Sequence, residues 1–386
     1  MTTVIIGSGL AGYLLAKEFR GLNPSAPIRI VTQSDGRFYS KPLLSTAFTQ
    51  EKTADMLAIS SAAEMAEELN AEININTNVI FIDAEKKLIQ VEDQNKNKVE
   101  IFYEQLILAS GSIVLEPKIQ GDGAKDILSV NSLDDYAVFR KKLLEKSSKK
   151  IAIIGAGLVG CEFANDLCNA GYEVDVIALA SQPLERLLPE PLGLALQSSL
   201  AEKGVRWYFN ALVDKINKTN RAYQLELRNG ETLDADFVLS AIGLRANTEL
   251  AAAAGIATHK GIQVNAYLET NIPNIYALGD CAEVNGQLMF YIAPLRKCVH
   301  ALARTLAGER TAVSYPAMSV SIKTPACPTV ACPPPEGSLG EWIVTGEDKD
   351  LRALYYDQQA NLRGFALTGS AAKERAELTS VLPAIF

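Results

Sequence analysis

The chain contains 386 residues, which is enough for two or three domains that fold without disulfide or metal support. Hydrophobic residues make up 48% and charged residues 21%, which excludes a mainly disordered, collagen-like or coiled-coil chain. The net charge of −8 argues against a protein that mainly binds nucleic acid or an anionic membrane.

Targeting and metal signals are missing from the sequence. No apolar run reaches the ~20 residues that a membrane-spanning helix needs. The apolar segment 1–6 has no basic leader and leads directly into a glycine motif, so we interpret it as a strand rather than a signal peptide. Six cysteines are too few for a disulfide scaffold, which favours the reducing cytoplasm, and the two histidines form no metal or hydrolase motif.

One internal similarity dominates the sequence. The segment 4–12 (VIIGSGLAG) recurs 148 residues later at 152–160 (AIIGAGLVG). Each copy is an apolar strand, a Gly-x-Gly-x-x-Gly loop and a helical pattern, and another strand pattern follows. The sequence predicts helices over 10–20 and 158–170 and the following strands over 28–32 and 173–178. Two copies in strand–loop–helix–strand context indicate two dinucleotide-binding units.

The three glycines of each copy have distinct physical tasks. The first permits the tight turn after the strand, the second lets the backbone approach a pyrophosphate, and the third lets the helix pack closely on the strand. The phosphates would then lie on the free N–H groups of the first helical turn, which Leu10 and Ala11 open in the first copy. In this order the glycines are Gly7, Gly9 and Gly12 in the first copy and Gly155, Gly157 and Gly160 in the second.

Local patterns predict the other elements. A helix is expected over 60–70, and a hairpin tip at 95–97 separates two of the strands that follow it. After Pro316 the composition changes to a proline-punctuated, β-rich tail that a helix over 371–382 closes. The predicted strands are 72–75, 79–83, 86–92, 99–103, 105–111, 237–243, 341–344 and 351–357.

A third motif points to a family. Residues 276–280 (YALGD) resemble the second FAD fingerprint of two-dinucleotide-binding flavoprotein reductases, in which the aspartate, here Asp280, hydrogen-bonds the ribityl chain. The resemblance implies an α/β, glutathione-reductase-like fold: two Rossmann-like dinucleotide-binding domains and a small C-terminal β-rich α+β domain. It assigns FAD to a split domain of residues 1–111 and 244–315, NADH to residues 112–243, and a C-terminal module to residues 316–386.

The cysteine positions narrow the branch of the family. Disulfide reductases carry a redox-active cysteine pair near the flavin, but residues 33–60 contain no cysteine. Cys161 and Cys168 lie on one predicted helix and are interpreted as packing residues. Cys327 and Cys332 (CPTVAC) lie in the tail, where a redox pair is the less favoured alternative to inert thiols.

A lysine-proline segment takes the place of the cysteine motif. Residues 37–45 (RFYSKPLLS) resemble the R-x-Y-x-K-P-x-L-S stretch of rubredoxin reductases, and residues 160–167 and 323–328 resemble further stretches of them. Ferredoxin reductases of oxygenase systems carry a related P-L-S element. The chain therefore resembles the FAD-dependent, NADH-using rubredoxin reductases, of the type that supplies alkane hydroxylases.

The resemblance also implies site residues. Lys41 would contact the flavin and pair with Glu162, with two solvated surface charges as the alternative. Lys323 would approach the pyrimidine edge of the flavin, where a cation stabilises the reduced ring. Ile292 would lie beside it, at the start of a helix whose dipole favours an anion. Val79 would contact the adenine through its backbone, and a plain core valine is the competing interpretation.

Two positions depart from the family pattern. The acid that holds the ribose about 20 residues after the first glycine loop is replaced; Gln33 or Ser34 substitutes for it, or Asp35 reaches in. In the second unit Ala178 stands where an acid would mark NAD. No basic residue follows until Arg186, so nothing would hold the extra phosphate of NADP, which favours NADH.

The function implied is transfer of hydride from NADH to FAD, and of single electrons from FAD directly to rubredoxin, whose iron is held by cysteine thiolates. The alternatives are a ferredoxin reductase of an oxygenase system, an NADH oxidase, and a non-enzymatic flavoprotein that senses redox state. Arg37, Lys41, Arg296 and Lys297 would form a basic rim for an acidic partner, or else be scattered solvated charges.

Overall fold

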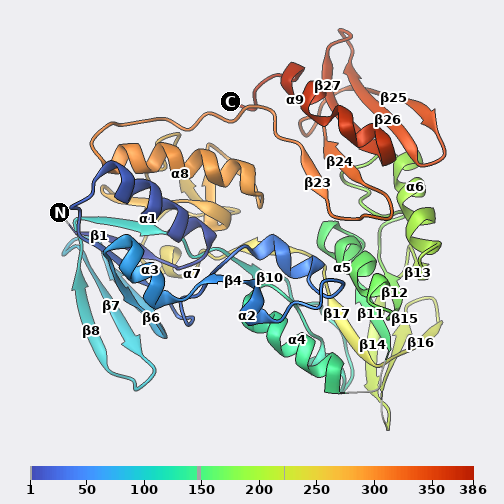
Figure 1. Cartoon of the computed structure of the whole chain (residues 1–386), viewed down its shortest axis with the longest axis horizontal. Helices are drawn as coiled ribbons and strands as arrows, with labels where there is room; N and C mark the ends of the chain where they lie inside the picture. Colours follow the sequence, from blue (N-terminus) through green and yellow to red (C-terminus); the bar gives the residue numbers. More distant parts are fainter. Residues whose placement is uncertain (1, 146–148, 221) are drawn as a thin grey trace.

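Figure 1 shows the computed structural model of the chain, which describes residues 2–145, 149–220 and 222–386. Met1, at the start of the first expected strand, lies outside the described residues. Two parallel sheets with flanking helices occupy the amino-terminal and middle parts of the chain, and an antiparallel sheet forms the carboxy-terminal part (Figure 1).

The first parallel sheet has the strand order β20-β9-β1-β2-β5. Every side chain of β1 is buried, as expected for a strand covered on both faces. Helix α1 (Leu10–Leu22) follows β1 and packs against α8 (Ile292–Leu306) (Figure 1). The strands are β1 (Thr3–Ile6), β2 (Ile28–Val31), β5 (Glu72–Asn74), β9 (Gln105–Leu108) and β20 (Ile275–Ala277).

An antiparallel sheet and short segments complete this part. In the sheet β6-β7-β8, Lys96 adopts a left-handed conformation at the hairpin tip (φ 66°), which confirms the turn predicted at 95–97. Helix α3 forms within the predicted stretch 60–70, and a capping box between Ser61 and Glu64 begins it. The bounds are β3 (Phe38–Tyr39), η1 (Lys41–Thr46), α2 (Ala54–Leu57), β4 (Ala58–Ser60), α3 (Ala62–Leu69), β6 (Thr77–Asp83), β7 (Leu88–Asp93) and β8 (Lys98–Phe102).

The second parallel sheet repeats the first. Its order is β13-β12-β11-β17, so β11 lies between the next strand and a later one, as β1 does between β2 and β9. An antiparallel sheet, β14-β15-β16, adjoins it. The elements are α4 (Leu133–Glu145), β11 (Lys150–Ile154), α5 (Leu158–Asn169), β12 (Glu173–Ile177), α6 (Glu190–Ala201), β13 (Val205–Tyr208), β14 (Val213–Lys218), β15 (Tyr223–Leu227), β16 (Thr232–Ala235) and β17 (Phe237–Ser240).

A two-stranded antiparallel connection joins the two parallel sheets. The chain leaves the first sheet through β10 (Ser112–Val114) and returns through β18 (Leu244–Ala246), which pairs with β10. Because β20 then adds to the first sheet, the second sheet is an insertion within the first unit. Shorter elements follow: α7 (Glu249–Ala253), β19 (Ile262–Val264), η3 (Gly279–Cys281), β21 (Ala282–Val284) and β22 (Gln287–Leu288); η2 (Ala124–Asp126) precedes α4.

The carboxy-terminal sheet has the order β23-β24-β27-β26-β25 and two buried faces. Three alanines of its strands, Ala331, Ala353 and Ala366, face α6, and Phe365 is among the residues that face the closing helix α9. The single helix expected over 371–382 is a 3₁₀ turn, η4, followed by α9. The bounds are β23 (Val320–Ile322), β24 (Thr329–Cys332), β25 (Gly340–Glu347), β26 (Asp350–Asp357), β27 (Leu362–Thr368), η4 (Gly369–Glu374) and α9 (Arg375–Val381).

Candidate cofactor-binding site

The first glycine of each loop is required by the backbone. Gly7 and Gly155 have φ angles of +113° and +115°, which side chains other than glycine rarely adopt. A Cβ atom on Gly7 would lie 2.3 Å from the carbonyl oxygen of Ala109, and one on Gly155 would lie 2.5 Å from that of Ala241. Both turns therefore press against the strand-end segment that follows β9 or β17.

The other glycines separate into packing and access positions. A Cβ on Gly12 or Gly160 would lie 2.0 Å from the carbonyl oxygen of the first glycine of the same loop, so these residues let the helix approach the strand. A Cβ on Gly9 or Gly157 would meet no atom within 4 Å, so the space in front of these residues is open.

The helices that follow the two glycine loops begin without a side chain that caps their first N–H groups. Gly9 and Gly157 are the N-caps of α1 and α5. In these two helices, all of whose residues are described, no side chain forms a capping hydrogen bond and the first turn contains no Asp or Glu. The first N–H groups of a helix have no partner within the helix, and they carry its positive dipole end. The residues present therefore fit a pyrophosphate at each loop.

A hydroxyl cluster links the first glycine loop to the end of β2. The Oγ of Ser8 donates to the Oγ1 of Thr32 at 2.9 Å, and the hydroxyls of Thr32 and Ser34 lie 3.0 Å apart. Gln33 is exposed beside them, whereas Asp35 is turned to Arg37. Of the three candidates for holding the ribose, Asp35 already has its carboxylate in an ion pair with Arg37, whereas Gln33 is exposed and Ser34 belongs to the hydroxyl cluster.

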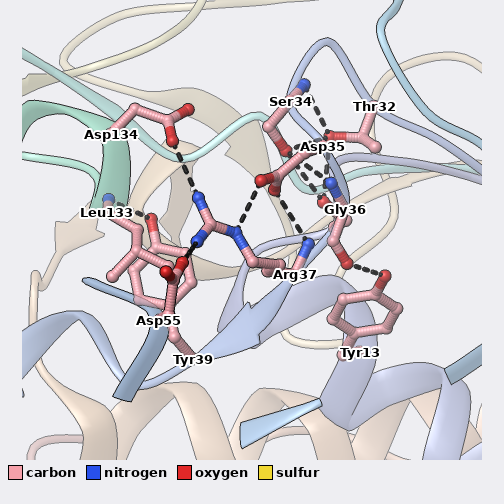
Figure 2. Close-up of polar contacts among 11 residues, drawn as sticks. Tyr13, Thr32, Ser34, Asp35, Gly36, Arg37, Tyr39, Asp55, Leu133 and Asp134 are labelled. Carbon is pink, nitrogen blue, oxygen red and sulfur yellow. Dashed lines mark hydrogen bonds and ion pairs between the residues drawn. The ribbon is translucent and has the colours of Figure 1, made fainter. Parts of the chain in front are cut away.

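Arg37 is surrounded by carboxylates, as Figure 2 shows. Its guanidinium lies 2.5 Å from Asp35, 2.8 Å from Asp55 and 3.0 Å from Asp134, and only 21% of its side chain is exposed. These partners come from the loop after β2, from α2 and from α4. Arg37 therefore ties three segments together, and the prediction that it contributes free positive charge to a basic rim is wrong.

The Gly-Asp turn of the third motif lies on the first turn of α1. Gly279 has a φ of +79°, and a Cβ there would lie 2.8 Å from the Cβ of Ala11. Asp280 accepts a hydrogen bond of 2.8 Å from Ser112, and the ammonium of Lys41 lies 3.0 Å from the Ser112 hydroxyl and 3.6 Å from Asp280. Burial lowers the pKa of Lys41, and the charge of Asp280 opposes that shift.

Glu162 forms a second charge cluster with a different lysine. Its side chain, 2% exposed, pairs with the ammonium of Lys323 and accepts a hydrogen bond from the hydroxyl of Ser45. The backbone N–H of Lys323 donates to it as well, at 3.0 Å, and the ammonium also donates to the carbonyl oxygen of Pro42 at 2.7 Å. The expected pairing of Lys41 with Glu162 is therefore wrong: Lys41 faces Asp280, and Glu162 faces Lys323.

Helix α5 carries two further buried polar side chains that the sequence analysis did not single out. Asp166 accepts the backbone N–H groups of Phe48 and Thr49, at 2.7 and 3.1 Å, and Asn165 accepts that of Ala326 at 3.2 Å. The signal was present, because polar residues three and four positions after Glu162 interrupt an otherwise apolar helix. This face of α5 binds both the segment after η1 and the carboxy-terminal module.

The short helix η1 connects the two charge clusters. Lys41 at its start reaches Asp280, and Ser45 near its end reaches Glu162 and Lys323. Four of the predicted site residues, from all three parts of the chain, thus converge on one six-residue segment. Ile292 begins α8 and is partly exposed, whereas the side chain of Val79 is buried in the core of the first sheet.

All six cysteines are free, and their surroundings disfavour thiolates. Burial raises the pKa of Cys161 and Cys327, and raises that of Cys168 and Cys332 to about 11. Cys327 and Cys332 face different cores, Cys327 toward α6 and Cys332 toward α9. The two tail cysteines therefore do not form a redox pair in this fold.

A groove of about 560 Å³ lies between the start of α8, the linker 316–319 and α9. Arg375 lines it and donates to the hydroxyls of Ser319 and Ser321, both at 2.8 Å. No carboxylate pairs with Arg375 among the described residues.

Among residues 2–145, 149–220 and 222–386, the helices are too short or too polar to cross a membrane, and no cluster of side chains suits a metal ion.

Two loops that fit a pyrophosphate, each after the first strand of its own parallel sheet, define a protein that binds two dinucleotides. Residues 1–301 match the family model described as pyridine nucleotide-disulphide oxidoreductase, and residues 312–382 match the rubredoxin binding C-terminal domain. The chain therefore belongs to the pyridine nucleotide-disulphide oxidoreductase family, and within it to the group of the rubredoxin-NAD(+) reductases.

Individual relatives agree with this placement. The chain is 44% identical over 384 residues to a rubredoxin-NAD(+) reductase of Alcanivorax borkumensis, covering 99% of both chains. It is 43% identical over 383 residues to one of Acinetobacter baylyi, covering 98% of this chain and 97% of the relative. The solved ferredoxin reductase for the CYP199A2 system of Rhodopseudomonas palustris shares the fold, with a TM-score of 0.87, 23% identity and coverage of 99% and 95%.

Proposed function

We propose that this protein passes electrons from NADH through FAD to rubredoxin. The observation that carries the proposal is that three parts of the chain meet at η1. η1 itself belongs to the part with the first parallel sheet, Glu162 comes from the part with the second sheet, and Lys323 comes from the rubredoxin-binding module. A chain built in this way would hold both nucleotides and the partner-binding module next to one another.

We propose that FAD lies on the first glycine loop and NADH on the second. The open space before Gly9 and Gly157 and the uncapped starts of α1 and α5 support this. The matching domains are 1–111 with 244–315 for FAD, 112–243 for NADH and 316–386 for the partner. The proposed FAD residues are Gly7, Gly9, Leu10, Ala11, Gly12, Gln33, Ser34, Lys41, Val79, Glu162, Asp280, Ile292 and Lys323; the NADH residues are Gly155, Gly157 and Gly160.

Bound FAD would accept hydride from NADH and release electrons one at a time. The chain supplies orientation and charge. Lys41 holds a proton at Nζ between Ser112 and Asp280, and the start of α8 adds a positive dipole end. Burial raises the pKa of the cysteine thiols, so electron transfer from FAD to the partner would proceed without a thiol step.

Rubredoxin would dock at the groove between α8 and α9. Most of the groove belongs to the region that matches the rubredoxin-binding domain, and its other wall is the start of α8, one residue from Ile292. An iron held by thiolates is anionic, and the guanidinium of Arg375, which has no carboxylate partner among the described residues, complements it.

Charge reversal in the carboxy-terminal module tests this docking. We expect Arg375→Glu to raise the KM for rubredoxin at least fivefold at low salt and to leave reduction of the flavin by NADH unchanged. Lys349→Glu, which makes the same charge change in the turn between β25 and β26 outside the groove, should alter the KM less than twofold. Equal effects of both variants would show that only net charge matters.

The acceptor itself is tested by turnover. Purified holoenzyme with NADH or NADPH should reduce rubredoxin in preference to ferredoxin, dithiols or oxygen, and should prefer NADH. A preference for ferredoxin would support the alternative of an oxygenase-system reductase. We further propose a cytoplasmic location, which six free cysteines favour, and supply of an alkane hydroxylase by the reduced rubredoxin.

A further inference from the structure

Ser112 lies where the chain leaves the first parallel sheet for the second. It is the first residue of β10 and pairs with Ala246 of β18 across the two-stranded connection. The side-chain nitrogen of Asn131 donates to its carbonyl oxygen at 2.8 Å. The backbone of Ser112 is therefore fixed by contacts that do not involve η1 or η3.

The hydroxyl of Ser112 stands between two opposite charges. It accepts a hydrogen bond of 3.0 Å from the ammonium of Lys41 and donates one of 2.8 Å to the carboxylate of Asp280. The direct distance from Lys41 to Asp280 is 3.6 Å, which exceeds a normal N–H···O hydrogen bond. A hydroxyl is one donor and two acceptors, so this single side chain serves both partners.

The surroundings of Ser112 leave few other groups that could bridge Lys41 and Asp280. Ser112 is buried, so water has little access to replace the hydroxyl if it is removed. The charged groups that act on Lys41 are Asp280 from η3 and Asp135 from α4, and Lys41 is hydrogen-bonded through Ser112 to the first of them. The position of the Lys41 ammonium relative to the Asp280 carboxylate therefore depends on the serine.

We propose that Ser112 is a positioning residue of the FAD site, whose hydroxyl holds the Lys41 ammonium and the Asp280 carboxylate in a fixed relation. This deepens the proposed function and rests on it, because FAD is the group that Lys41 and Asp280 would contact. Ser112 is not part of the glycine loops, the lysine-proline segment or the Gly-Asp turn. It also lies at the exit to the second unit, so it links that connection to the charges of the first unit.

The first test measures FAD binding by the full-length protein. We expect Ser112→Ala to raise the FAD dissociation constant about tenfold, as for loss of a hydrogen bond to a charged group, and Ser112→Thr, which keeps the hydroxyl, to change it less than twofold. In a Lys41→Met background the effect of Ser112→Ala should fall below threefold, because the two residues act together. The proposal would be overturned if Ser112→Ala and Lys41→Met raised the FAD dissociation constant by independent, multiplying factors, or if Ser112→Ala and Ser112→Thr raised it equally.

The second test reads Lys41 itself and does not depend on catalysis. Acylation of Lys41 by acetic anhydride, followed across pH by mass spectrometry, reports when the amine loses its proton. In Ser112→Ala the ammonium loses an acceptor but stays in its partly buried position, so this pH should move down. In Ser112→Thr it should stay the same. An unchanged profile in the alanine variant would contradict the proposal.

This measurement also separates the proposal from the function on which it rests. A wild-type chain that bound no FAD would refute the proposed function, yet the Lys41 profile would still show whether Ser112 positions it. Ser112→Cys, a weaker donor of similar size, gives a third point and should fall between alanine and threonine in both tests. Should the alanine variant fail to fold, a cysteine variant with wild-type values would count against the proposal.

Discussion

The ammonium of Lys323 pairs with the buried carboxylate of Glu162, 161 residues earlier in the chain. The contact joins the segment after β23 to helix α5, and Ser45 adds η1 to the same carboxylate. A buried charge is costly unless it is paired and hydrogen-bonded, and Glu162 has both kinds of partner. This side chain therefore adds a buried charge pair to the packing that holds the carboxy-terminal module against α5 and α6.

Removal of the Glu162 charge should loosen that junction. We expect Glu162→Gln to lower the free energy of unfolding by about 2 kcal/mol, less than for a fully buried pair because Lys323 is one-third exposed. Urea unfolding measures the change. Glu374→Gln, which removes the exposed partner of Arg352 in the same module, should cost below about 1 kcal/mol. Equal losses would mean that Glu162 is not the stronger contact.

The two access glycines should separate the two cofactors. A Cβ at Gly9 or Gly157 meets no protein atom, so neither alanine variant should unfold the chain, but each fills the space in which a pyrophosphate would lie. We expect Gly9→Ala to lose FAD on gel filtration. Gly157→Ala should keep FAD, and its KM for NADH should rise about tenfold.

The packing glycines provide the control for that experiment. A Cβ at Gly12 or Gly160 would lie 2.0 Å from a carbonyl oxygen, so Gly12→Ala and Gly160→Ala should lower the unfolding temperature whether or not nucleotide is present. If Gly9→Ala retained FAD with wild-type affinity, or if Gly157→Ala were the variant that lost it, the assignment of the two loops would be wrong.

Lys41 should impose a basic limit on flavin reduction. Its pKa in the folded protein is lowered by burial, so the side chain is charged below that pKa and loses its proton before the ordinary lysine value of 10.5. The rate constant for flavin reduction by NADH should therefore fall as pH rises through a value below 10.5. Stopped-flow absorbance at the flavin band measures it, and Lys41→Met should show no such limb.

The same shift has a definite sign for stability. Between the folded and unfolded pKa values of Lys41 the unfolded chain binds more protons, so this group adds stability as pH rises through that window. Lys41→Met should remove this increase in urea unfolding experiments. An increase of equal size in both proteins would assign the pH dependence to other groups.

Thiol reagents should have little effect on the enzyme. Five of the six cysteines are buried, and burial raises the pKa of the remaining one, Cys168, to about 11. Iodoacetamide at neutral pH should change NADH-dependent bleaching of the flavin less than twofold. Inactivation in step with the labelling of one cysteine would restore a sulfur relay to the mechanism.

The features that could be predicted from the sequence are local ones. The glycine loops are set by spacing within nine residues, and the structure gives each glycine the backbone or packing constraint that its position implies, as with Gly7 and Gly12. The hairpin tip at Lys96 and the capped start of α3 were likewise predictable, because turn and cap residues act within one turn of chain.

The choice of charge partners could not be predicted in the same way. Lys41 and Glu162 were matched by family resemblance, but side chains of opposite charge from several segments meet around η1, and packing decides which pair forms. Ser45 closes the lysine-proline motif and Ser112 follows a predicted strand, but neither position indicates a partner. The partners of these two serines lie 71 to 168 residues away, or farther for Lys323. Arg37 looked free because none of its carboxylates is identifiable before the loop, α2 and α4 are folded together.

Anaerobic stopped-flow mixing tests the central claim most directly. Holoenzyme mixed with one equivalent of NADH should lose the absorbance of oxidised flavin, and a second mixing with oxidised rubredoxin should restore it as the rubredoxin is reduced. The account predicts this restoration after treatment of the enzyme with iodoacetamide as well as without it. A purified chain that takes up no FAD, or a reduced flavin that rubredoxin fails to reoxidise, would contradict it.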